Sequence, residues 1–134
     1  MPGLSTVQYN LNHSSDGYEF FVTANTLDTN LQIGHAVSYL KDINYKNSTA
    51  TICFPGEEHF VWVEPEFRNR GIGTAMIRHT GEILKDIFRG TVKKTLAYAV
   101  TSEQSLPYYQ KVFGAKLLPD TGVNGQLRQI RFEI

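Results

Sequence analysis

The chain has 134 residues, of which 41% are hydrophobic, which is the size of one domain with a sizeable core. Thirteen basic and thirteen acidic side chains cancel, so no overall positive field would attract nucleic acid or an anionic membrane. Cys53 is the only cysteine, which excludes an internal disulfide framework and favours a reducing compartment; we expect it to be a small buried residue. No signal-peptide pattern and no run of about 18 apolar residues occurs. We therefore expect a single cytoplasmic domain over residues 1–134.

The first half of the chain predicts a succession of strands. Segments rich in β-forming side chains alternate with polar turn sequences such as HSSDG and TLDTN, which favours hairpins. Pro65 cannot donate to a ladder and closes the last of these strands. The predicted strands lie at residues 5–12, 18–25, 31–40, 48–54 and 59–65.

The pattern changes to that of an amphipathic helix between Gly71 and about Phe88. Apolar side chains recur there at spacings of three, four and seven, with charged side chains between them. A buried strand at 93–100 and a shorter helix at 102–113 follow, with Gly114 near the helix end. Two final strands are predicted at 114–119 and 126–134, and the chain has no repeat or linker.

The turn that opens the first helix contains Gly71 and Gly73. The first N–H groups of a helix have no internal partners and carry the positive end of its dipole, and glycine lets a phosphate approach them closely. The dinucleotide fingerprint is excluded, because it needs glycine or alanine where this chain has Met76. The nucleotide-triphosphate loop is excluded as well, because no Gly-Lys pair occurs.

The segment V-x-P-x-x-R-x-x-G-I-G, from Val63 to Gly73, resembles the acetyl-CoA pyrophosphate motif of the GNAT superfamily of N-acetyltransferases. It follows an apolar strand, it opens an amphipathic helix, and the next strand and helix come in the family's order. The resemblance covers residues 31–134. It implies an α/β fold with a central, mostly antiparallel twisted sheet, one splayed pair of parallel strands, and flanking helices.

The family usually places two helices between its first two strands, and they form one wall of the acceptor site. Here only HSSDG separates the first two predicted strands. We therefore expect these helices to be reduced or absent and the acceptor groove to be open. An open groove would suit a peptide or protein substrate, or it would be completed by a second subunit in a homodimer.

Residues 99–117 match the family in a second region. Tyr109 takes the position of a family tyrosine, Ser102 replaces the usual asparagine, and Ser105 replaces the usual alanine. Serine hydroxyls can still form hydrogen bonds with the CoA arm.

The resemblance implies that acetyl-CoA is the acyl donor and that no metal is needed. Outward N–H groups of residues 61–63 would bind the pantetheine arm, and the N–H near Val63 would stabilise the thioester oxyanion. The following turn would hold the pyrophosphate, although exposed arginines are often merely solvated. The implied cofactor residues are Val61, Trp62, Val63, Arg68, Asn69, Arg70, Gly71, Ile72, Gly73, Thr74, Ser102 and Ser105.

Acetyl transfer to an amine requires a base for the amine and a proton for the departing thiolate. Glu57 lies at the spacing from Arg68 at which some family members carry their base, while Glu64 and His59 remain alternatives. Glu57 could equally be a solvated turn residue. We expect Tyr109 to donate the proton to the thiolate rather than its neighbour Tyr108, since adjacent helical residues point about 100° apart.

The sequence thus predicts an acetyl-CoA-dependent N-acetyltransferase that transfers to a primary amine in a ternary complex. The alternatives are a catalytically silent GNAT-fold binding or structural module, and an unrelated α/β domain that binds another phosphate ligand. The acceptor stays open between a small molecule, a peptide and a protein lysine; no nucleic acid or membrane partner is expected.

Overall fold

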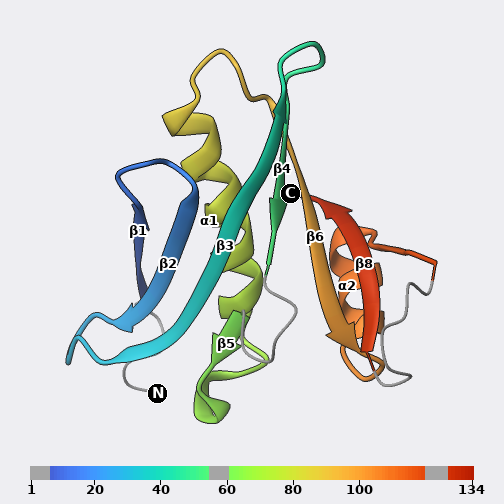
Figure 1. Cartoon of the computed structure of the whole chain (residues 1–134). Helices are drawn as coiled ribbons and strands as arrows, with labels where there is room; N and C mark the ends of the chain where they lie inside the picture. Colours follow the sequence, from blue (N-terminus) through green and yellow to red (C-terminus); the bar gives the residue numbers. More distant parts are fainter. Residues whose placement is uncertain (1–6, 55–60, 120–126) are drawn as a thin grey trace.

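The computed structural model describes residues 7–54, 61–119 and 127–134, and it contains one mixed sheet with two helices (Figure 1). The sheet order is β1-β2-β3-β4-β6-β8-β7, and β5 pairs with β3. All neighbours are antiparallel except β4 and β6. The elements are β1 (Val7–His13), β2 (Glu19–Thr26), β3 (Gln32–Asn44), β4 (Thr49–Cys53), β5 (Val61–Val63), the 3₁₀ turn η1 (Pro65–Phe67), α1 (Ile72–Ile87), β6 (Lys94–Ser102), α2 (Leu106–Phe113), β7 (Lys116–Leu117) and β8 (Leu127–Glu133).

This arrangement confirms the expected fold class, with its parallel strand pair and flanking helices. The strand predicted at 31–40 is longer than expected, because residues up to Asn44 pair with β4. The second helix is shorter than expected, because Ser102 still pairs with Leu127 as the end of β6. Helix α1 is close to its predicted bounds.

Both helices lie on the same face of the sheet (Figure 1). The burial pattern of β2 identifies the covered face, because Phe20, Val22 and Ala24 are fully buried and alternate with half-buried residues. The buried side of α1, which includes Met76 and Leu84, packs on this face. The core therefore lies in a single layer between the sheet and the helices.

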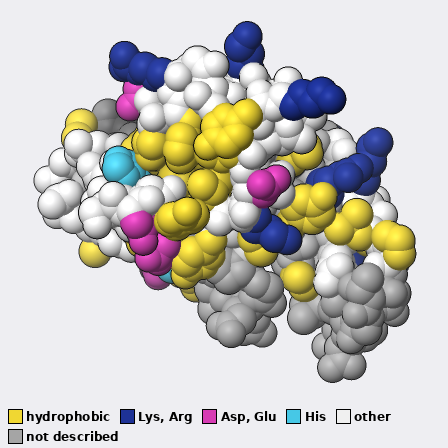
Figure 2. Space-filling view, turned by 45° about the horizontal axis from the view of Figure 1, so that its top comes forward, with side chains coloured by type: hydrophobic (Ala, Val, Ile, Leu, Met, Phe, Trp, Pro, Cys, Tyr) yellow, Lys and Arg dark blue, Asp and Glu magenta, His cyan; other side chains and the backbone are white. Residues whose placement is uncertain are grey.

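The opposite face of the sheet carries no helix in the described part of the chain. Strands β1 and β2 are joined by a short turn, so the helices that the family usually has at this point are absent, as expected. Side chains that point to this face, such as Phe21, Val37 and Tyr98, are only half-buried. Figure 2 shows hydrophobic side chains gathered near the middle of the view, with basic side chains toward its upper and right edges.

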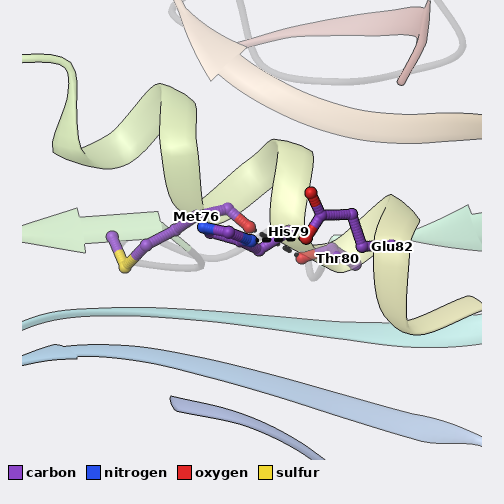
Figure 3. A network of polar contacts seen from close by, with 4 residues as sticks. All are labelled: Met76, His79, Thr80 and Glu82. Carbon is purple, nitrogen blue, oxygen red and sulfur yellow. Dashed lines mark hydrogen bonds and ion pairs between the residues drawn. The ribbon is translucent and has the colours of Figure 1, made fainter. Parts of the chain in front are cut away.

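Helix α1 contains two side-chain hydrogen bonds between its own residues. Thr80 is buried, and its hydroxyl donates to the Met76 carbonyl at 3.1 Å (Figure 3). On the exposed side of the same helix, His79 Nδ1 lies 2.7 Å from Glu82 Oε2. The His79 ring also contacts the Tyr9 ring of β1. The unsatisfied backbone groups of α1 are those at its ends.

Strand β3 pairs with two different strands along its length. Its second half pairs with β4, and Gly34–Ala36 in its first half pair with β5. Strand β4 runs parallel to β6 as far as Cys53 and Tyr98, and the Phe54 N–H donates to the Tyr98 carbonyl at 2.9 Å. Beyond that bond β6 pairs only with β8 among the described strands, while β5 stays with β3. A gap therefore opens between β5 and the end of β6, which is the expected splay.

Gly34 lets β5 and α1 lie close to β3, and substitution of this glycine tests that close approach. An added Cβ would lie 2.8 Å from the Trp62 carbonyl oxygen and 3.1 Å from Met76 Cε, so β5 or α1 would have to shift. We expect Gly34→Ala to lower the free energy of unfolding by about 1–3 kcal/mol in urea denaturation. Gly73→Ala is the control, since its methyl would make ordinary contacts at 3.6 and 3.8 Å with Val61 and Val63. Unchanged stability of Gly34→Ala would contradict the close approach of β5.

Candidate functional site

The turn from Arg68 to Thr74 presents free backbone N–H groups at the start of α1. Asn69 and Gly71 have left-handed φ values of 65° and 80°, and Gly71 caps the helix without a side-chain hydrogen bond. The first intrahelical bond runs from the Ala75 N–H to the Gly71 carbonyl at 2.9 Å, so the N–H groups from Ile72 to Thr74 precede the ladder. The first turn of α1 contains no acidic side chain. These features together favour an anionic ligand.

Gly71 and Gly73 are explained by different physical constraints on the turn. Gly71 is required by its positive φ, and a Cβ there would meet nothing within 4 Å. Gly73 has no such constraint, and a Cβ there would make only ordinary contacts. The fold therefore tolerates a side chain at Gly73, and a ligand that approaches the backbone closely would explain the glycine.

A cleft of about 370 Å³ opens beside this turn. Its walls come from β5, η1, the first turns of α1, and the connection from β6 into α2. Of the expected cofactor residues, Arg68, Asn69 and the run 71–74 line it, as do Val61, Val63 and Ser105. Trp62, Arg70 and Ser102 are not among its lining residues.

Strand β5 presents one free edge to the cleft. The Glu64 N–H donates to the Ile33 carbonyl at 2.8 Å, and N–H groups alternate in direction along a strand. The N–H and C=O groups of Val61 and Val63 therefore point away from β3, whereas those of Trp62 point toward it. Residues 61–63 were expected to bind the pantetheine arm through outward N–H groups. Val61 and Val63 have N–H groups with this outward direction, and Trp62 does not.

Arg68 ties the turn to β5. Its Nε donates to the Val63 carbonyl at 2.8 Å, and its guanidinium lies 4.4 Å from the centre of the Trp62 ring. The Trp62 indole N–H in turn donates to Glu64 Oε2 at 3.2 Å. Trp62 therefore supports Arg68, which remains exposed at the cleft. Arg70 lies over the Phe67 ring at 5.9 Å instead.

The connection from β6 to α2 brings a residue to the cleft that we did not predict. The Ser102 hydroxyl accepts a hydrogen bond from the Ser105 N–H at 3.2 Å, so it stabilises the turn. Gln104, between these serines, lines the cleft. Its place in the strand-to-helix connection before α2 was the signal that the sequence offered for this position.

The two tyrosines of α2 both line the cleft but differ in environment. Tyr109 is 7% exposed and packs against Phe113 and Phe132, whereas Tyr108 is 37% exposed. Burial raises the pKa of the Tyr109 hydroxyl above its ordinary value, and neighbouring Tyr108 adds to the rise. Tyr109 is therefore held neutral. The Tyr108 hydroxyl shares a hydrogen bond with the Thr74 hydroxyl and so connects α2 to α1.

Two of the candidate bases, Glu57 and His59, lie outside the described residues. Glu64 is exposed before η1 and does not line the cleft.

Within the described residues no group of three or more His, Cys, Asp and Glu side chains could hold a metal ion. None of the helices described is long and apolar enough to cross a membrane.

Comparisons with known proteins agree with this geometry. The model of the acetyltransferase (GNAT) family matches residues 6–115. A Desulfovibrio desulfuricans protein classed in the GNAT family is 14% identical with a TM-score of 0.61, over 96% of this chain and 98% of that one. Arabidopsis thaliana NAA60, in complex with a bisubstrate analogue, is 13% identical with a TM-score of 0.59, over 96% of this chain and 97% of that one.

A third similar structure is the PaiA N-acetyltransferase of Thermoplasma acidophilum in complex with coenzyme A. It is 18% identical with a TM-score of 0.53, over 90% of this chain and 64% of that one. Identities this low show the fold alone. Among curated proteins, none matches the sequence.

Gly73→Ala tests the anion site directly. Because a methyl at this position fits the protein but would narrow the cleft beside Val61 and Val63, we expect CoA affinity to fall at least about tenfold in calorimetry. The melting temperature should stay the same or rise, since alanine is favoured over glycine in helices by up to about 1 kcal/mol. Gly71→Ala should instead lower stability, because φ there is 80°. Unchanged CoA affinity in folded Gly73→Ala would move the site elsewhere.

Proposed function

Because the chain belongs to the GNAT family of acetyltransferases, we propose that it transfers an acetyl group from acetyl-CoA to a primary amine by direct transfer in a ternary complex. The observation that carries the proposal is the cleft that runs from the free N–H groups of α1 to the gap between β5 and β6. One end of this cleft suits a diphosphate, and the other offers a strand edge to an extended amide-bearing chain.

The cofactor would lie along three parts of this cleft. Its diphosphate would accept hydrogen bonds from the N–H groups of 72–74, with Arg68 nearby to balance charge. The pantetheine arm would add to the free edge of β5 through Val61 and Val63, as an extended chain adds to a strand. The Val63 N–H would then stabilise the oxyanion that forms at the thioester carbon.

The transfer step needs a neutral amine. Its nitrogen attacks the thioester carbonyl carbon, the C–S bond breaks, and CoA leaves as a thiolate. A primary amine with a reference pKa of about 10.4 is protonated at neutral pH, so a base must remove its proton. Glu57 is our candidate for this base, directly or through water, and Glu64 and His59 are its competitors.

The thiolate needs a proton, and Tyr109 is our candidate donor. The raised pKa of its hydroxyl keeps that proton in place at working pH. Tyr108 would serve instead to hold the cleft walls together through Thr74. The two adjacent tyrosines would therefore have separable tasks.

Calorimetry with CoA, acetyl-CoA and ATP tests the proposal first, followed by acetyl-CoA turnover with a panel of amines. We expect CoA and acetyl-CoA to bind, ATP not to bind, and at least one amine to be acetylated. The CoA and bisubstrate-analogue complexes of the similar proteins support this expectation for the fold. Binding without turnover on any amine would instead favour a catalytically silent module.

Tyr109→Phe removes only the hydroxyl and keeps the ring's packing. We expect kcat to fall by roughly 10 to 10³ while CoA affinity persists, because water can partly replace the acid. In the wild type, kcat should show no loss from Tyr109 ionisation below about pH 10, the ordinary tyrosine pKa, since burial moves this pKa upward. Tyr108→Phe is the matched variant and should change CoA affinity more than kcat. The opposite pattern would assign the acid role to Tyr108.

Glu57→Gln tests the base. We expect turnover at neutral pH to fall by about 10² or more, with partial recovery as pH rises and the amine loses its proton unaided. Rates are to be measured between pH 6 and 9, with Glu64→Gln as the control. Wild-type rates for Glu57→Gln over this whole range would transfer the role to another group or to water.

A further inference from the structure

A second pocket of about 190 Å³ opens on the uncovered face of the sheet. It lies at the point where the parallel pairing ends, because Cys53 and Phe54 form one wall and the run 98–100 of β6 forms the other. The cofactor cleft approaches the same gap from the helix side, through Val61 and Val63 of β5. An acceptor placed in the second pocket would therefore approach the thioester from the face opposite the cofactor.

The pocket is small and mostly apolar. Its volume lies below the range of roughly 300–1,000 Å³ that is usual for drug-sized ligands, so it suits a small molecule. Cys53 contributes here as a half-buried side chain, in contrast to the buried residue we expected. Val100, Leu118 and Ile130 add apolar surface.

Lys41 is the one charged side chain that lines this pocket among the described residues. Its ammonium lies 5.4 Å from the centre of the Tyr98 ring. The register of β3 shifts between Leu40 and Asp42, which makes Lys41 the extra residue of a β-bulge. Bulges are frequent beside active sites, where they re-aim a side chain.

The surroundings of the pocket are also basic. Arg131 lies directly opposite Tyr98 on β8, and Lys116 lies opposite Arg131 on β7, so both share the uncovered face. None of these three cations forms an ion pair with a described carboxylate. Asp42 follows Lys41 but pairs with Thr51, further from the gap, and Glu133 is engaged by Lys94 at 3.8 Å.

We propose that this pocket is the acceptor subsite and that Lys41 selects amines that carry a carboxylate, such as a free α-amino acid with an apolar side chain. The proposal rests on the proposed acetyl transfer. The carboxylate would pair with the Lys41 ammonium, and the apolar side chain would fill the rest of the pocket. Cationic amines without a carboxylate would be repelled by the same charges.

The positive charges would also help the reaction. A cation near the acceptor ammonium lowers the pKa of that ammonium, so a larger fraction of the amine is neutral. The neutral nitrogen then attacks the thioester carbon, its proton passes to the base or to water, and CoA leaves with the electron pair of the C–S bond. Lys41 thus acts as a specificity-determining residue and takes no part in the proton transfers.

Three amines with the same apolar side chain test this inference: leucine, leucinamide and 3-methylbutylamine, which is leucine without its carboxyl group. We expect kcat/KM of the wild type for leucine to exceed that for each of the other two by at least about tenfold. Lys41→Gln keeps much of the side chain and removes its charge, so it should abolish this preference. Lys46→Gln, which removes a charge from the exposed β3–β4 turn, should leave it intact.

Calorimetry separates this inference from the proposed function. Titration of N-acetyl-leucine and N-acetyl-leucinamide into the CoA-bound protein reports the subsite without turnover. Tighter binding of the carboxylate that depends on Lys41 supports the subsite even if no amine is acetylated. Acetylation of all three amines at equal rates, or a preference for leucine that survives in Lys41→Gln, would overturn the subsite and leave the acetyl transfer standing.

Discussion

The structure depends on the place where a parallel strand pair stops pairing. Among the residues that the structure describes, the hydrogen bond from the Phe54 N–H to the Tyr98 carbonyl is the last between β4 and β6. Strand β3 makes this ending possible, because it is long enough to hold β4 along one half and β5 along the other. The sheet stays continuous on one side of the gap while it opens on the other. Both pockets lie against this gap, one on each face.

The helices give the two sides of the gap different chemistry. On the covered face, α1 aims unpaired N–H groups at the cleft, and α2 brings tyrosines against it. On the uncovered face, no described helix restricts access, and a bulge aims a lysine at the second pocket. An anionic cofactor and an anionic acceptor would thus each meet positive charge, from backbone dipoles on one face and from side chains on the other.

Much of the candidate cleft beside α1 could be predicted, because most of its residues are close together in sequence. Gly71, placed between a strand and an amphipathic pattern, indicates a tight turn into a helix, and that turn determines where the free N–H groups lie. Trp62 and Ser102 could not be placed in this way. The indole supports Arg68 from the other face and the serine hydroxyl stabilises its own turn, and both contacts depend on side-chain direction.

The sequence by itself determined the order of strands and helices, the amphipathic face of α1 and the glycine turn that begins it, because each depends on local periodicity or on the backbone preference of glycine. Only the tertiary structure decided that β3 also pairs with β5, since the turn sequences indicate hairpin neighbours and not a partner further along the chain. It also decided that Tyr109 is buried while Tyr108 reaches Thr74, and that Lys41, Tyr98 and Arg131 meet on one face. These residues are far apart in the chain, and only the register of the sheet and the packing of α2 bring them together.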